Sequence, residues 1–281
     1  ETYLDEFKDL EDELSRLVLY WNFRNHRATE TFRVDKIIES FKDKSIRGFP
    51  IDRLVGYIRQ HIAYMKEKSY KLDGSDDLPT HTASTNCMSL VLYLMGETDE
   101  LLEYVPDMEG FVKRFTRFLS KPEVQMVSTP QTGDFVIWRD LDNLDLLQDY
   151  LPFGYKSTQY TFSYVVTHTG LIFVDGENPW KIDDTSLFSE RTLTNWNRLD
   201  LVERVKELQS VYIVQERRTR ENITVIPLDE SAAHRGGSDM FDFRFFRRLD
   251  SPPQQSGTWV SKLYPELPNR LKKRYDEAVK L

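Results

Sequence analysis

The chain has 281 residues, 40% of them hydrophobic, and a formal net charge of -8 at pH 7. This length and apolar content suffice for one large globular domain, or one domain with an extension, and they exclude a disordered chain. The acidic balance argues against a nucleic-acid groove or an anionic membrane surface as the main partner, because both require clustered cations. No apolar run reaches the roughly 18 residues of a transmembrane helix, so the sequence predicts no membrane span.

The first part of the chain carries helical patterns. Apolar residues recur every three or four positions over residues 3–21 and again over residues 34–41, as in amphipathic helices. Pro50 is well placed to begin a third helix, because proline is favoured in the first helical turn. We therefore expect a helical N-terminal region over residues 1–75 that packs on the rest of the chain.

A polar stretch changes abruptly into an apolar one at Cys87, the single cysteine of the chain. Small polar residues precede it, and residues 88–94 are mostly large and apolar up to Gly96, which is typical of a loop that leads into a buried helix. Unpaired backbone N–H groups and the positive end of the helix dipole favour a thiolate at the first helical residue. Cys87 therefore suits a nucleophile, and the alternative is a small buried hydrophobic residue.

Strand patterns follow a further amphipathic helix around residues 111–119. Turn-forming residues 175–179 would connect two of the strands in a β-hairpin. Because helices come first and strands later, the sequence predicts an α+β fold with one antiparallel sheet. The expected strands are residues 135–138, 164–174, 180–185, 211–214 and 223–227.

His168 is the candidate base among the five histidines of the chain. A thiol nucleophile needs a base within reach, and the base needs an orienting group on its other nitrogen. His168 lies within an expected strand, which is a rigid mount, and Gly170 would leave space beside the imidazole. The alternative is a buried, hydrogen-bonded strand histidine. His61 is interpreted as a packing or surface residue, and His81 ranks below His168 because its loop lacks a rigid mount.

Two aspartates on the expected returning strand are candidates for the orienting group. Asp183 and Asp184 lie across the turn from His168, and cross-strand neighbours approach to about 5 Å. Adjacent strand residues point to opposite faces, so only one of the two can reach the imidazole. A bulge at Pro179 would select Asp183. Asn178 is the next candidate if neither aspartate serves.

Together these motifs resemble the papain-like cysteine hydrolases of the bacterial NlpC type and their amidase-like relatives. The resemblance is carried by Cys87 at a helix start, by Gly133-Asp134 before an aromatic strand, and by His168-Thr169-Gly170 on the next strand. It implies a papain-like core over residues 76–228, with the nucleophile at a helix N-terminus. It also implies cleavage of an amide or peptide bond of peptidoglycan through a thioester intermediate.

The resemblance assigns a role to each site residue. Cys87 would attack the carbonyl carbon, and His168 would take its proton and return it to the leaving amine. Asp184 would orient the imidazolium, with Asp183 as the alternative third residue. The Cys87 backbone N–H would help to bind the oxyanion, with a second donor from the preceding loop that the sequence does not identify.

Two departures from the family pattern leave alternatives open. The residues before Cys87 are not the Asp or Phe-Asp often found in that family, and an aspartate replaces the usual third His or Asn. Residues 180–185, Trp-Lys-Ile-Asp-Asp-Thr, resemble the transglutaminase-like pattern, which selects Asp184 and implies a protease or a crosslinker. A non-catalytic binding protein on the same fold is the third reading.

The expected partner is a peptide or a peptidoglycan fragment. We expect no nucleic acid and no cofactor. We also expect no metal, since a single cysteine excludes a multi-cysteine zinc site. A cell-wall substrate and a chain that begins without methionine favour a periplasmic or secreted location, with the cytoplasm as the alternative. Residues 229–281 are expected to form an extension that wraps the domain. The sequence does not indicate an oligomeric state.

Overall fold

The computed structural model of the chain describes residues 5–13, 15–16, 34–42, 47–71, 87–102, 108–140, 166–174, 187–188, 211–216, 223–228, 241–251 and 259–263.

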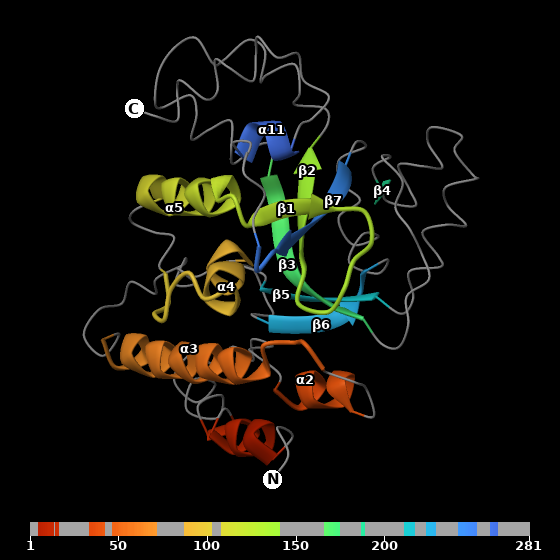
Figure 1. Cartoon of the computed structure of the whole chain (residues 1–281). Helices are drawn as coiled ribbons and strands as arrows, with labels where there is room; N and C mark the ends of the chain where they lie inside the picture. Colours follow the sequence, from red (N-terminus) through yellow and green to blue (C-terminus); the bar gives the residue numbers. More distant parts are fainter. Residues whose placement is uncertain are drawn as a thin grey trace.

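Seven strands in this part of the chain form one sheet in which every pairing is antiparallel (Figure 1). The main path runs β1-β7-β2-β3-β5-β6, and the short β4 pairs with β7. The predicted α+β class with one antiparallel sheet is therefore confirmed. The strands are β1 Val124–Val127, β2 Phe135–Asp140, β3 Val166–Val174, β4 Leu187–Phe188, β5 Val211–Glu216, β6 Ile223–Pro227 and β7 Phe241–Arg248.

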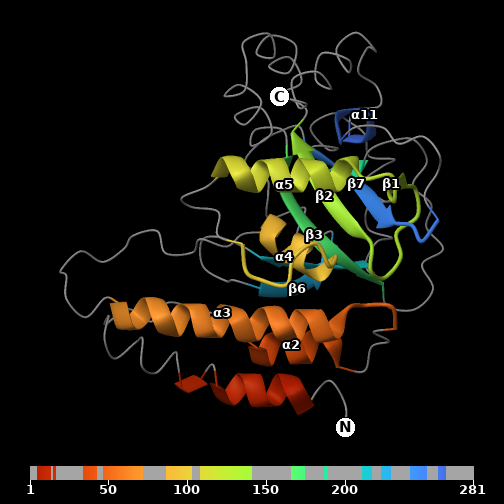
Figure 2. The same cartoon turned by 60° about the vertical axis from the view of Figure 1, so that its left-hand side comes forward.

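The described helices up to α5 lie where the sequence pattern indicates, whereas α11 was not predicted. Residues 5–13 and 15–16 are helical within the first predicted span. Figure 2 shows α4 between α3 and α5, beside the sheet, and α4 contacts β3 and β5. The remaining described helices are α2 Val34–Phe41, α3 Ile51–Lys71, α4 Cys87–Leu94, α5 Met108–Ser120 and α11 Trp259–Leu263.

The main hydrophobic core lies between the helices and one face of the sheet. Phe135 and Ile137 of β2 and Leu171 and Phe173 of β3 belong to one buried cluster with α4 and the N-terminal helices. The Phe173 ring lies 5.3 Å from the Phe41 ring of α2. Burying each large side chain of this kind stabilises the fold by about 1.5–3 kcal/mol. The N-terminal helices therefore share their core with the sheet.

The opposite face of the central strands is also buried. Strand alternation places Val136 and Trp138 of β2 and His168 and Ile172 of β3 on this second face. These side chains are between 0% and 2% exposed. The central strands are thus buried on both faces, although only one face is covered by the described helices.

The position of β7 differs from the expected role of residues 229–281. Instead of wrapping the domain, residues 241–248 of this segment pair with β1 on one side and with β2 on the other. Phe241, Phe243 and Phe245 alternate with polar residues, which is the period of a strand. The last described strand is therefore an interior member of the sheet.

The predicted returning strand, residues 180–185, lies outside the described residues, but the described edges of β3 leave it no place beside the turn. The segment Leu171–Val174 pairs with β5 along one edge. Along the other edge, Ile172 exchanges two backbone hydrogen bonds with Gly133 and Asp134, and the Val174 N–H donates to Thr132 Oγ1. Both edges of β3 are occupied near the turn, so no returning strand can pair there.

Lys262 anchors α11 to the end of α5. Its Nζ donates to the carbonyl oxygens of Leu119, Lys121 and Val124 at 2.9, 2.6 and 2.6 Å. Burial lowers the pKa of Lys262 to about 8, while the charge of Glu123 acts in the opposite direction. The amine thus binds carbonyl oxygens at the end of α5, in the turn after it and at the start of β1.

Candidate functional site

Cys87 is the first residue of α4, as the sequence predicts. The side chains of residues 88–94 are all buried, whereas Cys87 is only half-buried. At the other end, the Gly96 N–H donates to Tyr93 O and the Glu97 N–H donates to Leu92 O, with Gly96 at φ +75°. This is the glycine-terminated helix end called the Schellman motif. The helix is therefore buried and well terminated, and its thiol lies at the partly accessible end.

The imidazole of His168 lies on the face of the sheet that α4 does not cover. Cys87 packs against the cluster that contains Leu171 and Phe173. His168 precedes Leu171 by three positions, so its side chain points to the opposite face, together with that of its cross-strand partner Trp138. Strand alternation thus directs the imidazole away from the cluster against which Cys87 packs. The described geometry therefore gives no support to the expected Cys87–His168 pairing, which stays a prediction.

The other predicted members of the site are not placed. Asp183, Asp184, Asn178 and His81 lie outside the described residues. The edges of β3 near the turn, where the two aspartates were expected, are occupied by β5 and by the turn before β2. The geometric argument that one of the two aspartates faces His168 is therefore lost, and the choice of Asp184 rests on the transglutaminase-like resemblance alone.

Asp134, of the Gly-Asp motif, forms a buried ion pair. Its side chain is 3% exposed, and its two oxygens each accept a 2.8 Å hydrogen bond from the guanidinium of Arg247 on β7. Asp134 Oδ2 also accepts from the Gln131 N–H at 2.7 Å. Burial raises the pKa of the Asp134 carboxyl, against the lowering effect of these hydrogen bonds. The carboxylate thus fixes the turn before β2 and fastens it to β7.

Gly133 has a backbone conformation that suits glycine alone. Its φ is +94°, and a Cβ built on it would lie 2.9 Å from the carbonyl oxygen of Gly48. Its N–H donates to Ile172 O at 2.9 Å. The loop before α3, the turn before β2 and strand β3 therefore meet at this residue. Both residues of the Gly-Asp motif thus have a structural role here.

His61 is a packing residue on α3, one of the two roles expected for it. It is 2% exposed, and its ring lies 6.2 Å from the Tyr57 ring and 6.4 Å from the Tyr64 ring. These residues form part of the stripe of α3 that faces α4, where the Tyr57 ring lies 5.2 Å from the Tyr93 ring.

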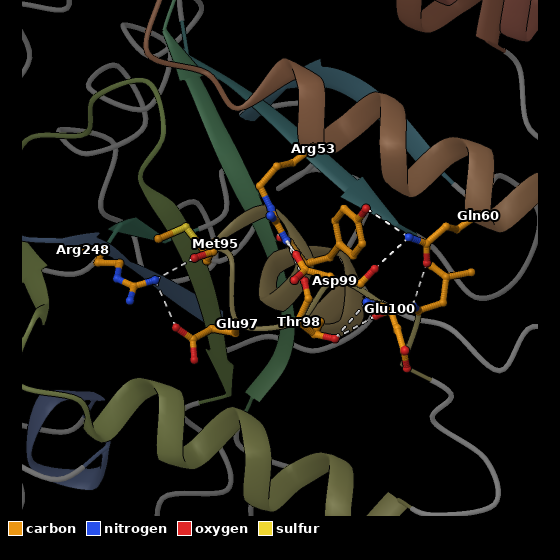
Figure 3. A network of polar contacts seen from close by, with 10 residues as sticks. Arg53, Gln60, Met95, Glu97, Thr98, Asp99, Glu100 and Arg248 are labelled. Atoms are coloured by element: carbon orange, nitrogen blue, oxygen red, sulfur yellow. Dashed lines mark hydrogen bonds and ion pairs between the residues drawn. The ribbon is translucent and has the colours of Figure 1, made fainter.

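A polar network at the C-terminal end of α4 was not predicted (Figure 3). Arg53 Nε donates to Tyr93 O at 2.5 Å, and its Nη2 donates to Thr98 O at 2.6 Å. The same guanidinium lies over the Tyr93 ring, with Cζ 4.7 Å from the ring centroid. Gln60 Nε2 donates to Tyr93 Oη at 3.2 Å and to Asp99 O at 2.8 Å. Two polar residues of α3 therefore hold the end of α4 and the loop that follows it.

A second arginine reaches the same end of α4 from β7. Arg248 Nη1 donates to Met95 O at 2.8 Å and lies 3.1 Å from Glu97 Oε1. Glu97 is also paired with Lys121 at 2.6 Å. The sequence signal for this network was weak, because residues far apart in the chain supply its charges.

Within the described residues, no group of three or more His, Cys, Asp or Glu side chains is arranged to hold a metal ion. None of the helices described combines the length and the apolar composition needed to cross a membrane.

Comparison of the chain with protein-family models, with curated proteins and with solved structures finds no match.

Proposed function

We propose that this protein is a cysteine hydrolase in which Cys87 attacks an amide or peptide bond, with a bacterial cell-wall peptide as the substrate class. The observation that carries the proposal is the position of Cys87. It is the half-buried first residue of a helix whose remaining residues are all buried. A helix start favours the thiolate, and partial exposure gives a substrate access to it.

The proposed chemistry passes through a thioester. The Cys87 thiolate would add to the carbonyl carbon of the substrate, and the amine would leave with a proton from a general acid. Water would then hydrolyse the thioester, so that the thiol is regenerated. The Cys87 backbone N–H is the first candidate donor to the oxyanion.

The identity of the base is the point at which the described structure and the family resemblance diverge. The resemblance names His168, but strand alternation directs this side chain away from α4. The proposal therefore rests on Cys87, and His168 enters it as a residue to be tested. The transglutaminase-like alternative rests on the sequence pattern around Asp184, which lies outside the described residues, and it stays open.

The separation of Cys87 from His168 favours a second candidate function. A protein that keeps this arrangement of helix and sheet without a thiol and imidazole pair would bind peptides and not cleave them. In such a binding protein the Gly-Asp motif would keep its structural role, because Asp134 is fully engaged with Arg247 and Gln131.

Digestion of purified peptidoglycan, followed by mass spectrometry of the released peptides, tests the proposal. Wild-type protein should release fragments, Cys87→Ala should release none, and both should unfold at similar denaturant concentrations. His168→Gln separates the readings of the base: full activity would exclude this imidazole from the chemistry. Absence of any cleavage by the wild-type protein, together with retained binding of the fragments, would support the binding protein instead.

A further inference from the structure

We propose that Arg53 raises the reactivity of the Cys87 thiol by neutralising the negative end of α4. The inference rests on the proposed function in one respect, because it takes Cys87 as the nucleophile. It adds a residue that acts through the helix and touches neither the thiol nor a substrate. Arg53 is therefore a positioning residue, whose charge acts on the thiol through α4, and it is not a catalytic residue.

The first step is the charge distribution of the helix. An α-helix carries roughly half a positive charge at its N-terminus and half a negative charge at its C-terminus. The two ends act on Cys87 in opposite senses, since the negative end disfavours a thiolate. In a helix of only eight residues, about 12 Å long, the far end lies close enough to matter. A cation on the last carbonyl groups removes this opposing contribution.

The second step is the position of the two arginines. Arg53 Nε binds the carbonyl oxygen of Tyr93, in the last turn of α4, and Arg248 Nη1 binds that of Met95, just beyond it (Figure 3). Both guanidinium groups therefore lie at the end of α4 that is remote from Cys87. They come from different elements, α3 and β7, so each can be changed without altering α4 itself.

The third step is that the two cations are not equally compensated. Among the described residues, Arg53 has one carboxylate partner, Asp99, at 3.0 Å, and the Asp99 side chain is 90% exposed, so that water screens its charge. Arg248 lies 3.1 Å from Glu97 and 3.6 Å from Glu123, whose side chains are only 11% and 24% exposed. The positive field of Arg53 along α4 should therefore exceed that of Arg248.

The expected size of the effect is modest and measurable. Across about 12 Å, with an effective dielectric constant of about 40, one unit charge changes the fraction of thiolate roughly threefold. At pH 6 an ordinary thiol of pKa about 8.5 is mostly protonated, so the alkylation rate follows the thiolate fraction. Because Cys87 is the only cysteine, alkylation of the full chain reports on this thiol alone.

The test is the rate of iodoacetamide alkylation at pH 6, with unfolding by urea measured for every variant. Arg53→Gln should react about threefold more slowly than wild type, whereas Arg53→Lys, which keeps the charge, should stay close to wild type. Arg248→Gln is the matched control and should change the rate less than Arg53→Gln. A wild-type rate in Arg53→Gln, or equal slowing in Arg53→Lys, would overturn the inference.

A second variant covers the case in which Arg53→Gln does not fold. Glu97 pairs with Lys121 and Arg248. Glu97→Gln keeps the shape of this side chain but removes its negative charge, so that the positive charges of Lys121 and Arg248 near the end of α4 are no longer compensated by it. Its alkylation rate should rise about twofold, and an unchanged or lower rate would contradict the inference. A wild-type thiol that reacts no faster than a free cysteine would refute the proposed nucleophile itself, and with it this role of Arg53.

Discussion

Replacing Gly133 by alanine should destabilise the protein more than any other glycine substitution at a described turn. The residue has φ +94°, and the added Cβ would lie 2.9 Å from the Gly48 carbonyl oxygen, which is well inside ordinary contact distance. The left-handed backbone alone costs an alanine about 1–2 kcal/mol. Overpacking against a fixed group adds about 1–3 kcal/mol. We therefore expect a loss of about 3 kcal/mol in the free energy of unfolding.

Gly96 provides the matched control for this experiment. It also has a positive φ, +75°, but a Cβ built there meets nothing within 4 Å. Gly96→Ala should thus cost only the backbone term, about 1 kcal/mol. The difference of about 2 kcal/mol between the two variants isolates the contact between Gly133 and Gly48.

Urea denaturation measures this difference directly. With a denaturant dependence of about 2 kcal/mol per molar urea, the two alanine variants should differ by about 1 M in their midpoints, at equal slopes. The contact with Gly48 resists displacement because the Gly133 N–H is also bonded to Ile172 O at 2.9 Å. If Gly133→Ala is no less stable than Gly96→Ala, the loop before α3 moves aside without cost. The predicted clash with the Gly48 carbonyl oxygen is then refuted.

Three further predictions concern the parts that hold the sheet together. Asp134→Asn should lower the free energy of unfolding by about 2–4 kcal/mol in urea denaturation, because it breaks a paired, mostly buried charge and leaves Arg247 uncompensated; a loss below about 1 kcal/mol would contradict this. The pKa of Lys262 is about 8 in the folded chain and about 10.4 when unfolded. The unfolded state therefore binds more protons over this range, and stability gains a contribution as pH rises from about 8 to 10.4 that is absent at lower pH. The measured difference in unfolding free energy between wild type and Lys262→Met should grow over that range, and a constant difference would exclude this titration. A chain that ends at residue 240 lacks β7 and should give no cooperative unfolding transition by circular dichroism, whereas a cooperative transition would show that the sheet forms without that strand.

Local patterns in the sequence were sufficient to predict α3 and α4. Pro50 and the apolar spacing after it predict α3, and the structure has this helix at Ile51–Lys71. The change from polar to apolar residues at Cys87 and the glycine at position 96 predict both ends of α4. These signals work because helix formation, caps and glycine-terminated ends depend on residues near one another in the chain.

The face on which His168 lies could not be read from the sequence. A half-buried strand alternates between apolar and polar residues, and the alternation identifies the face that meets the core. Around His168 the pattern is lost, because Leu171, Ile172 and Phe173 are all apolar and all fully buried. A strand buried on both faces carries no such signal. Only the helices packed against Leu171 and Phe173 reveal that the imidazole points the other way.

The order of the strands in the sheet could not be predicted from the sequence either. The turn residues after Val174 are genuine turn formers, but the neighbours of β3 are β2 and β5, which lie elsewhere in the chain. Phe241, Phe243 and Phe245 have the period of a strand, yet nothing local to them specifies an interior position between β1 and β2. Pairing partners in a sheet are chosen by the whole chain, so local propensity cannot name them.

The interior position of β7 affects how the protein is made. Val124 of β1 pairs with Arg248 of β7, so this part of the sheet closes only after most of the chain has been synthesised. Until then β1 and β2 each have an unpaired edge, and such edges invite pairing with other chains. Contacts between residues so distant in sequence also slow folding. The nascent chain should therefore depend on protection by chaperones until residues 241–248 have left the ribosome, and it should aggregate if translation stalls before them.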